Sequence, residues 1–269
     1  MRAAPAIRAV MERRLLVNYR VDPELLAALL PAPFRPVLVA GYGVAGICLI
    51  RLGQVRPEGV PARAGLTSEN AAHRVAVCWD GPDGPATGVY IFRRDTSSRL
   101  AALVGGRLFP GWHHLARFRA EEHEGRFRVQ ADSRDGVIHL LVAGHLAADL
   151  PPGSVFADVA SASRFFRCAP VGYSATPTEG RFDGVELETA GWRLRPLQLD
   201  EVSSSFFDDH ERFPPGTAVA DSAFLMGGVA TTWRPRPELR AAAAGPHPGA
   251  PARTAPPMAP LSGGRRHLP

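Results

Sequence analysis

The sequence predicts an α+β fold that consists mostly of antiparallel strands, arranged as a barrel or sandwich with two or three short helices. Many short apolar segments are separated by turn signals, such as GPDGP at 81–85 and Asp-Gly at 135–136. Helical periodicity is confined to a few segments, which lie at 22–30, 97–104 and 155–167. With 45% hydrophobic and 21% charged residues, the composition is that of an ordinary globular chain.

The N-terminal quarter is expected to begin with a loose leader at 1–10 and a strand at 13–20. Asp22 can cap the helix that follows at 22–30, and the proline after it suits the first helical turn. An apolar run at 36–52 contains three glycines, so we expect either two strands or one bulged strand there.

The rest of the body is expected to add strands in sequence order. These lie at 74–79, 88–93, 113–122, 126–132, 136–146, 184–188, 192–199 and 219–233. Residues 1–236 are expected to form a single domain. From 237 to 269 the chain is low in complexity and rich in alanine and proline, so a disordered tail is expected.

All 31 basic residues are arginines, so no side-chain amine is present for Schiff-base chemistry. The formal charge is +5, but four arginines and one glutamate at 237–269 supply +3 of it. The remaining chain is close to neutral and carries no helix-turn-helix, zinc-finger or ribonucleoprotein motif. We therefore expect no nucleic acid among its partners.

Cysteine usage and the lack of long apolar runs indicate a cytoplasmic protein. Cys48, Cys78 and Cys168 are widely spaced and form no CxxC motif, which favours free thiols in a reducing compartment. The N-terminus lacks an apolar stretch long enough for a secretory signal, and no 18-residue uncharged apolar run occurs. No membrane partner is expected, and a homo-oligomer is compatible with the sequence.

Polar residues cluster between 67 and 114. One short segment, expected to be a loop, brings together Glu69, Asn70 and His73. The strand ending at Arg93 and Arg94 adds two guanidiniums, whose planar forks suit a carboxylate ligand. A carboxylate beside such a site can act as an acid or base, although surface ion pairs would give the same pattern.

The segment GGRLFPGWHH at 105–114 adds Arg107, His113 and His114. Adjacent strand residues face opposite ways, so only one of the two histidines can point into a barrel, and the sequence does not tell which. Because paired rings diverge in this way, no metal site is predicted, and no cofactor is predicted either. Glu69, His113 and His114 are the catalytic candidates, and Asn70, His73, Arg93, Arg94 and Arg107 are the candidates for binding substrate.

The body resembles the YqjF-like family of bacterial proteins, a domain family of unknown function. The segments that carry the resemblance include GYGVAGICLIRL (41–52), LTSENAAHRVAV (66–77), GGRLFPG with HH (105–114) and SSFFDD (204–209). That family is distantly similar to the acetoacetate decarboxylase-like superfamily. The resemblance implies an antiparallel β-barrel or cone with a few flanking helices.

In the decarboxylases, a Gly-Arg-Glu segment precedes Gly-Phe-Pro-Lys, and the lysine forms a Schiff base with a β-keto acid. Here Gly111 stands where that lysine is expected, and Leu108 stands in place of the acid. Glu69 is similar in position to the glutamate of the superfamily's active site. The resemblance therefore implies the fold without the amine-dependent decarboxylation.

Three functions fit these residues. The first is a lyase, hydratase, isomerase or cyclase that holds a small oxo acid or carbonyl compound and works without an amine, with Glu69 as its acid or base. The alternative is a non-catalytic small-molecule binding or sensor protein that uses the same pocket. The third is an interaction module with a closed interior. A solvent-accessible pocket with an acid–base group would favour the first.

Overall fold

The computed structural model describes residues 4–81, 84–106 and 110–241. In this part of the chain, three α-helices accompany fourteen strands. The helices are α1 (Pro23–Leu29), α2 (Arg99–Val104) and α3 (Val159–Arg167). The first seven strands are β1 (Ile7–Val21), β2 (Arg35–Pro36), β3 (Leu38–Val39), β4 (Tyr42–Pro57), β5 (Leu66–Gly81), β6 (Gly84–Thr96) and β7 (His114–His123). The others are β8 (Arg126–Ser133), β9 (His139–Leu146), β10 (Val171–Ala175), β11 (Arg181–Thr189), β12 (Arg195–Ser204), β13 (Ala218–Met226) and β14 (Val229–Arg240).

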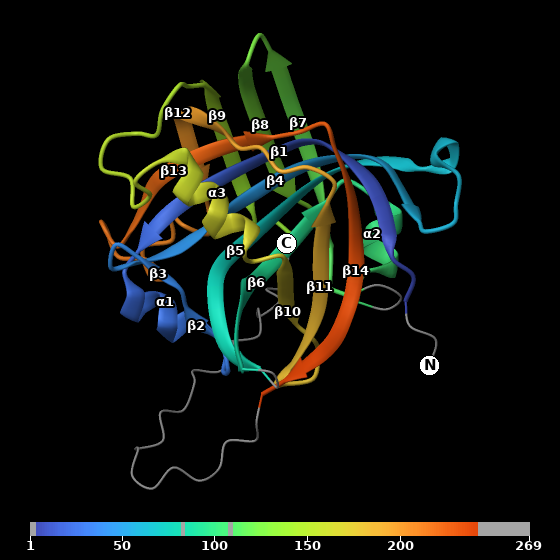
Figure 1. Cartoon of the computed structure of the whole chain (residues 1–269), viewed down its shortest axis with the longest axis horizontal. Coiled ribbons are helices and arrows are strands. Elements are labelled where there is room, and N and C mark those ends of the chain that lie inside the picture. Colours follow the sequence, from blue (N-terminus) through green and yellow to red (C-terminus); the bar gives the residue numbers. More distant parts are fainter. Residues whose placement is uncertain (1–3, 82–83, 107–109, 242–269) are drawn as a thin grey trace, which may run out of the picture.

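All fourteen strands belong to one sheet that closes on itself twice (Figure 1). One ring of strands runs β1, β4, β5, β6, β10, β11 and β14 and returns to β1. The other leaves β6 through β7, β8, β9, β12 and β13 and also returns to β1. Most pairs are antiparallel, whereas β6 pairs in parallel with β7 and β10. The predicted fold class, mostly strands with a few short helices, is confirmed.

The four strands β1, β4, β5 and β6 form a wall that both rings share. Because successive side chains of a strand alternate between the two faces, each wall strand serves both rings. On β5, Val75 and Val77 pack into the larger apolar core with Leu15 and Val17 of β1. Ala76 packs on the opposite face, in a second apolar cluster that includes residues of α3.

All three expected helical segments contain a helix, although α3 begins at Val159, later than the expected 155, and side-chain caps mark where α1 and α3 begin. Asp22 caps α1, because its side chain accepts hydrogen bonds from the backbone N–H groups of Glu24 and Leu25. Asp158 begins α3 with a capping box that it forms with Ser161. The apolar face of α3 packs on the second cluster, so this helix lies against the shared wall in front of β4 and β5 (Figure 1). Among the described residues, no helix is long and apolar enough to cross a membrane.

Several expected boundaries are wrong. Strand β1 begins at Ile7, inside the expected leader, because it pairs there with both β14 and β4. Strand β5 begins at Leu66, so the polar segment expected to be a loop is a strand. Strand β10 was not expected, and β14 continues to Arg240, past residue 236. Residues 242–269 of the expected tail lie outside the described residues.

Candidate functional site

The ring that contains β10 and β11 encloses a cavity of about 1620 Å³. Its wall on β5 is built from one face of that strand: Ser68, Asn70, Ala72, Arg74 and Ala76. Small residues at 72 and 76 leave room there for longer side chains from the neighbouring strands. Aromatic side chains from α3 and from the segment after β11 also line the cavity, among them Phe166 and Trp192.

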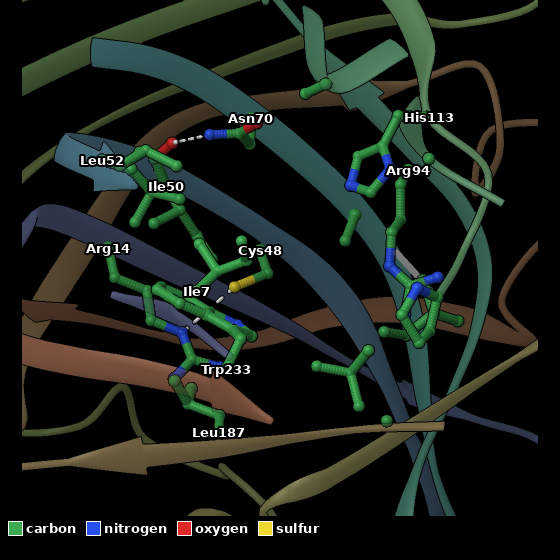
Figure 2. A pocket seen from close by; sticks show the side chains of 18 of the residues that line it. Ile7, Arg14, Cys48, Ile50, Leu52, Asn70, Arg94, His113, Leu187 and Trp233 are labelled. Atoms are coloured by element: carbon green, nitrogen blue, oxygen red, sulfur yellow. Dashed lines mark hydrogen bonds between the residues drawn. The ribbon is translucent and has the colours of Figure 1, made fainter. Parts of the chain in front are cut away.

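The extended conformation of residues 66–81 separates the polar residues that the sequence analysis grouped together. In a strand, Asn70 faces the cavity, while Glu69 and His73 point to the opposite side of the wall. The amide of Asn70 is already engaged by the protein. It donates to the carbonyl oxygen of Ile50 at 3.3 Å (Figure 2). It also accepts from the hydroxyl of Thr96 at 2.8 Å.

Glu69 lies in an ion-pair network on the far side of the wall. It accepts a hydrogen bond from Arg13, which also donates to Glu122 of β7 at 2.5 Å. Burial raises the pKa of Glu69, and the guanidinium of Arg13 opposes this effect. The structure therefore does not bring this candidate acid or base to the cavity.

His73 is fully buried on the same far side as Glu69. Its Nε2 lies 3.2 Å from the hydroxyl of Ser204, and its ring packs against Phe206. Burial and the nearby Arg93 lower the pKa of His73 to about 3, so the ring is neutral. Ser204 is also fully buried, which makes this serine–histidine contact part of the core.

A β-bulge in β6 decides which of two adjacent arginines enters the cavity. Opposite β5, Ile91 pairs with Arg74 and Arg93 pairs with His73, so Phe92 is the extra residue. Ile91 faces the cavity, and without the bulge the alternation would place Arg93 there. The bulge shifts the alternation by one residue, and Arg94 faces inward instead.

Arg93 pairs outside the cavity with two carboxylates. It donates to Asp95 at 2.9 Å and to Asp135 at 2.8 Å. Asp95 has no exposed surface, and burial raises its pKa while Arg93 opposes that shift. This arginine is therefore occupied by the protein and is not placed to hold a substrate.

Arg94 and His113 lie side by side in the cavity (Figure 2). The guanidinium of Arg94 donates to the hydroxyl of Ser174, and its burial lowers its pKa to about 10. It fills the space next to Gly111, where a Cβ would overlap Nη1 of Arg94. Arg94 thus remains charged at neutral pH and occupies the place towards which a side chain at 111 would project.

His113 is the histidine of the pair that enters the cavity, whereas His114 is exposed and lies 3.3 Å from Asp135. Nδ1 of His113 lies 3.1 Å from the carbonyl oxygen of Gly111. A carbonyl can only accept, so Nδ1 carries the proton of the neutral ring and Nε2 keeps a lone pair. Burial and the charge of Arg94 lower the pKa of His113 to about 4.

Sequence reasoning missed four further arginines that, among the described residues, line the cavity: Arg14 of β1, Arg56 of β4, Arg74 of β5 and Arg167 of α3. Arg14 donates through Nε to the thiol of Cys48 at 3.1 Å (Figure 2). Arg74 was part of the quoted polar segment, and strand alternation from Asn70 would have placed it in the cavity. Of the predicted site residues, the structure brings Asn70, Arg94 and His113 to this cavity, while Arg107 lies outside the described residues.

Within the described ranges, no group of three or more histidine, cysteine or acidic side chains is arranged to hold a metal ion. In the described part of the chain, five arginines line the cavity instead, and Arg14, Arg74 and Arg94 are the three that project from the shared wall with buried or partly buried hydrogen bonds. The carboxylate of Asp183 also lines it and accepts from the backbone N–H of Gly111 at 3.3 Å. An excess of buried guanidinium groups favours an anionic ligand.

Comparison with protein families gives one match, to the family model DUF2071, which is described as an uncharacterized conserved protein. The match covers residues 8–223. No curated protein matches the chain in sequence.

Several solved structures share the fold. Acetoacetate decarboxylase from Legionella pneumophila subsp. pneumophila str. Philadelphia 1 has a TM-score of 0.57 and 16% identity, over 88% of each chain. The enduracididine biosynthesis enzyme MppR in complex with pyruvate has a TM-score of 0.56 and 14% identity, over 87% of this chain and 91% of MppR. An acetoacetate decarboxylase-like enzyme from Sphingomonas wittichii RW1 has a TM-score of 0.54 and 14% identity, over 89% of this chain and 93% of that enzyme. Identities this low show the fold alone, and they confirm the expected acetoacetate decarboxylase-like architecture.

Proposed function

The chain belongs to DUF2071, the YqjF-like family of uncharacterized conserved proteins, and we propose that it binds a small organic acid with a carbonyl group in the cavity. The observation that carries this proposal is the pair formed by Arg94 and His113. A buried guanidinium offers a planar fork to a carboxylate or to an enolate oxygen. A neutral imidazole with a free Nε2 lies beside it, ready to accept a proton.

The reaction that this pair supports is removal of a proton from the carbon next to the carbonyl. Arg94 stabilises the negative charge that develops on oxygen, because its guanidinium stays charged at neutral pH. His113 takes the proton on Nε2. Isomerase, lyase, hydratase and cyclase chemistry can each proceed through such an enolate, and none of them then requires a side-chain amine.

The structural neighbours support the choice of ligand class at the level of fold. One of them, MppR, is described in complex with pyruvate, and others are named acetoacetate decarboxylase. Both names point to short oxo acids in cavities of this fold. In this lysine-free chain, Arg94 takes the space beside Gly111, so a charged guanidinium replaces covalent attachment as the anchor.

The proposal is tested by proton NMR in D2O with short 2-oxo and 3-oxo acids. Wild-type protein is expected to exchange the protons next to the carbonyl for deuterium, and His113→Gln is expected to lose this exchange. His139→Gln is the matched control, because His139 is exposed and pairs with Asp132 far from the cavity. Saturable ligand shifts without exchange would favour a binding or sensor protein.

Glu69→Gln distinguishes the two candidate bases. If Glu69 were the base, as its resemblance to the superfamily's glutamate implies, exchange would disappear in this variant and persist in His113→Gln. That result, or a complete absence of binding and exchange across the panel of acids, would overturn the proposal.

A further inference from the structure

We propose that the ligand of this cavity is a short-chain dicarboxylic oxo acid. One end of it binds at Arg94, and its second carboxylate binds at Arg74 and Arg14. This inference rests on the proposed function, in which Arg94 and His113 hold the end of the ligand that reacts. It assigns a separate task to two of the cavity arginines that the proposed reaction does not use.

Arg74 is a buried guanidinium with unused hydrogen-bond donors. Only 3% of the residue is exposed, and one of its nitrogens donates to the amide oxygen of Asn18 at 2.7 Å. Nε and Nη1 are buried and have no hydrogen-bond partner. Because a buried polar group without a partner is costly, an arginine in a cavity with two free nitrogens points to a ligand that supplies the acceptors.

The surroundings of Arg74 fix its orientation without neutralising its charge. Asn18 donates its own amide N–H groups to Ser222 at 3.2 and 3.3 Å, which turns its oxygen towards Arg74. The guanidinium carbon lies 5.1 Å from the centre of the Phe166 ring. Among the described residues, no carboxylate lies within ion-pair distance of Arg74.

Arg14 adds a second positive charge to the same part of the wall. Its guanidinium lies 5.9 Å from the centre of the Trp192 ring, and Nε donates to the thiol of Cys48. Within the described part of the chain it has no carboxylate partner either. The burial of Arg74 lowers its pKa to about 10; the nearby Cys48 opposes this shift and the charge of Arg14 adds to it, and at this value Arg74 is charged at neutral pH. Two uncompensated guanidiniums attract an anion to this end of the cavity.

The strand register places this pair beside Arg94 on one face of the wall. Ala72 pairs with Cys48 on one side and with Arg94 on the other, and Arg74 follows two residues along β5. The Cα atoms of Arg74 and Arg94 are therefore about 8 Å apart, from the usual rise and spacing of strands. From there the guanidinium of Arg74 extends to Asn18 of β1 and that of Arg94 extends to Ser174 of β10, so a ligand that lies between them needs an anionic group at each end.

The test compares two acids of equal chain length, 2-oxoglutarate and 2-oxopentanoate, which differ in the distal carboxylate. Isothermal titration calorimetry on the whole chain is expected to show at least about tenfold tighter binding of 2-oxoglutarate, the gain typical of a charge-assisted hydrogen bond. Arg74→Met is expected to abolish this preference and to leave the affinity for 2-oxopentanoate within about twofold. Arg94→Met is expected to weaken the binding of both acids.

Arg14→Met provides a second variant if Arg74→Met does not fold, and it is expected to reduce the same preference. Arg128→Met is the matched control, because Arg128 forms an exposed pair with Glu201 at 2.9 Å, away from the cavity. Equal affinity of the wild type for the two acids would overturn the second carboxylate site and leave the proposed function standing. A preference that survives in both variants would also overturn it, whereas failure of both acids to bind would overturn the proposed function as well.

Discussion

The guanidinium of Arg94 lies in the space that a side chain on Gly111 would occupy. Gly111 adopts a φ of +89°, a conformation that glycine accepts readily and other residues rarely adopt. The two residues are therefore coupled: the absence of a side chain at 111 is what allows Arg94 to reach its place beside His113. This coupling, with the contacts described above, leads to five predictions.

Gly111→Ala is expected to displace Arg94 and to weaken the binding of oxo acids at least tenfold. Gly216→Ala is the matched control, because Gly216 has a similar φ of +84° but nothing within 4 Å of its Cβ position. Both variants should lose about 1–2 kcal/mol of stability from backbone strain. Only the first should lose affinity, measured by calorimetry, and equal affinities would contradict the coupling.

Arg74→Met is expected to leave the stability of the unliganded protein unchanged within about 1 kcal/mol, or to raise it. Replacing a buried, incompletely paired charge by an apolar side chain of similar length is often neutral or favourable. Arg13→Met provides the contrast, because Arg13 is 2% exposed and pairs with both Glu69 and Glu122. Urea unfolding should show a loss of about 2–4 kcal/mol for Arg13→Met. An equal loss in Arg74→Met would mean that this arginine is structural.

Proton exchange catalysed by the protein is expected to rise with pH through about 4 and then to stay level to at least pH 8. His113 must be unprotonated to act as a base, and its pKa is lowered to about 4. Arg94 stays charged over the same range, since its pKa is about 10. A rate that instead rises through pH 6.5, the ordinary value for histidine, would show that His113 is not buried as described.

Acid should destabilise the protein between pH 6.5 and about 3, and the loss should begin above the pH at which most carboxylates are protonated. The pKa of His73 is about 3 in the folded protein and 6.5 when unfolded, so its contribution is complete above pH 6.5 and is lost as the pH falls. Within that window, a histidine with such a lowered pKa reduces the free energy of unfolding by up to about 1.4 kcal/mol for each unit by which the pH falls. In urea titrations, His73→Asn should show a smaller slope of stability against pH than the wild type. Identical slopes would contradict this assignment.

Asp95→Asn is expected to cost about 2–4 kcal/mol, because it removes one of the two carboxylates that neutralise Arg93. Asp135→Asn should cost less, since Asp135 is 40% exposed and water can replace it. The loss of stability in each variant is measured by thermal unfolding. A larger loss in Asp135→Asn would mean that the exposed carboxylate dominates the pair with Arg93.

The fold could be predicted from short-range signals. Asp22 followed by proline marks the start of α1, and alternating apolar residues mark most strands. These signals fail for the first half of strand β5, which the sequence predicts to be a loop. Its first half is polar on both faces, because Glu69 pairs with Arg13 on one side and Asn70 lies in the cavity on the other. A strand between two polar environments lacks the apolar alternation by which a strand is detected, so it resembles a loop.

Which arginine of β6 faces the cavity depends on a β-bulge that the sequence does not indicate. The extra residue in β6 is Phe92, an ordinary strand residue, and no glycine marks the bulge. Either arginine at 93 and 94 could therefore have entered the cavity. Only the pairing of β5 with β6 selects Arg94, and only the fold brings Arg14 to the same wall from a distant part of the sequence.

The wall that the two rings share also limits how this chain can change during evolution. Insertion of one residue within β5 would exchange the faces on one side of the insertion. An insertion after residue 70, for example, would bring His73 into the cavity and drive Arg74 into the apolar core. Such an insertion would alter both the cavity and the apolar core, so length changes should be rare in β1, β4, β5 and β6 among natural relatives. They should collect instead in the turns between strands, such as the one that joins β7 to β8. A bulge is the form in which a strand absorbs one extra residue, and it shifts the alternation only on one side of itself. The bulge at Phe92 therefore offers a route by which related chains could exchange one cavity arginine for its neighbour.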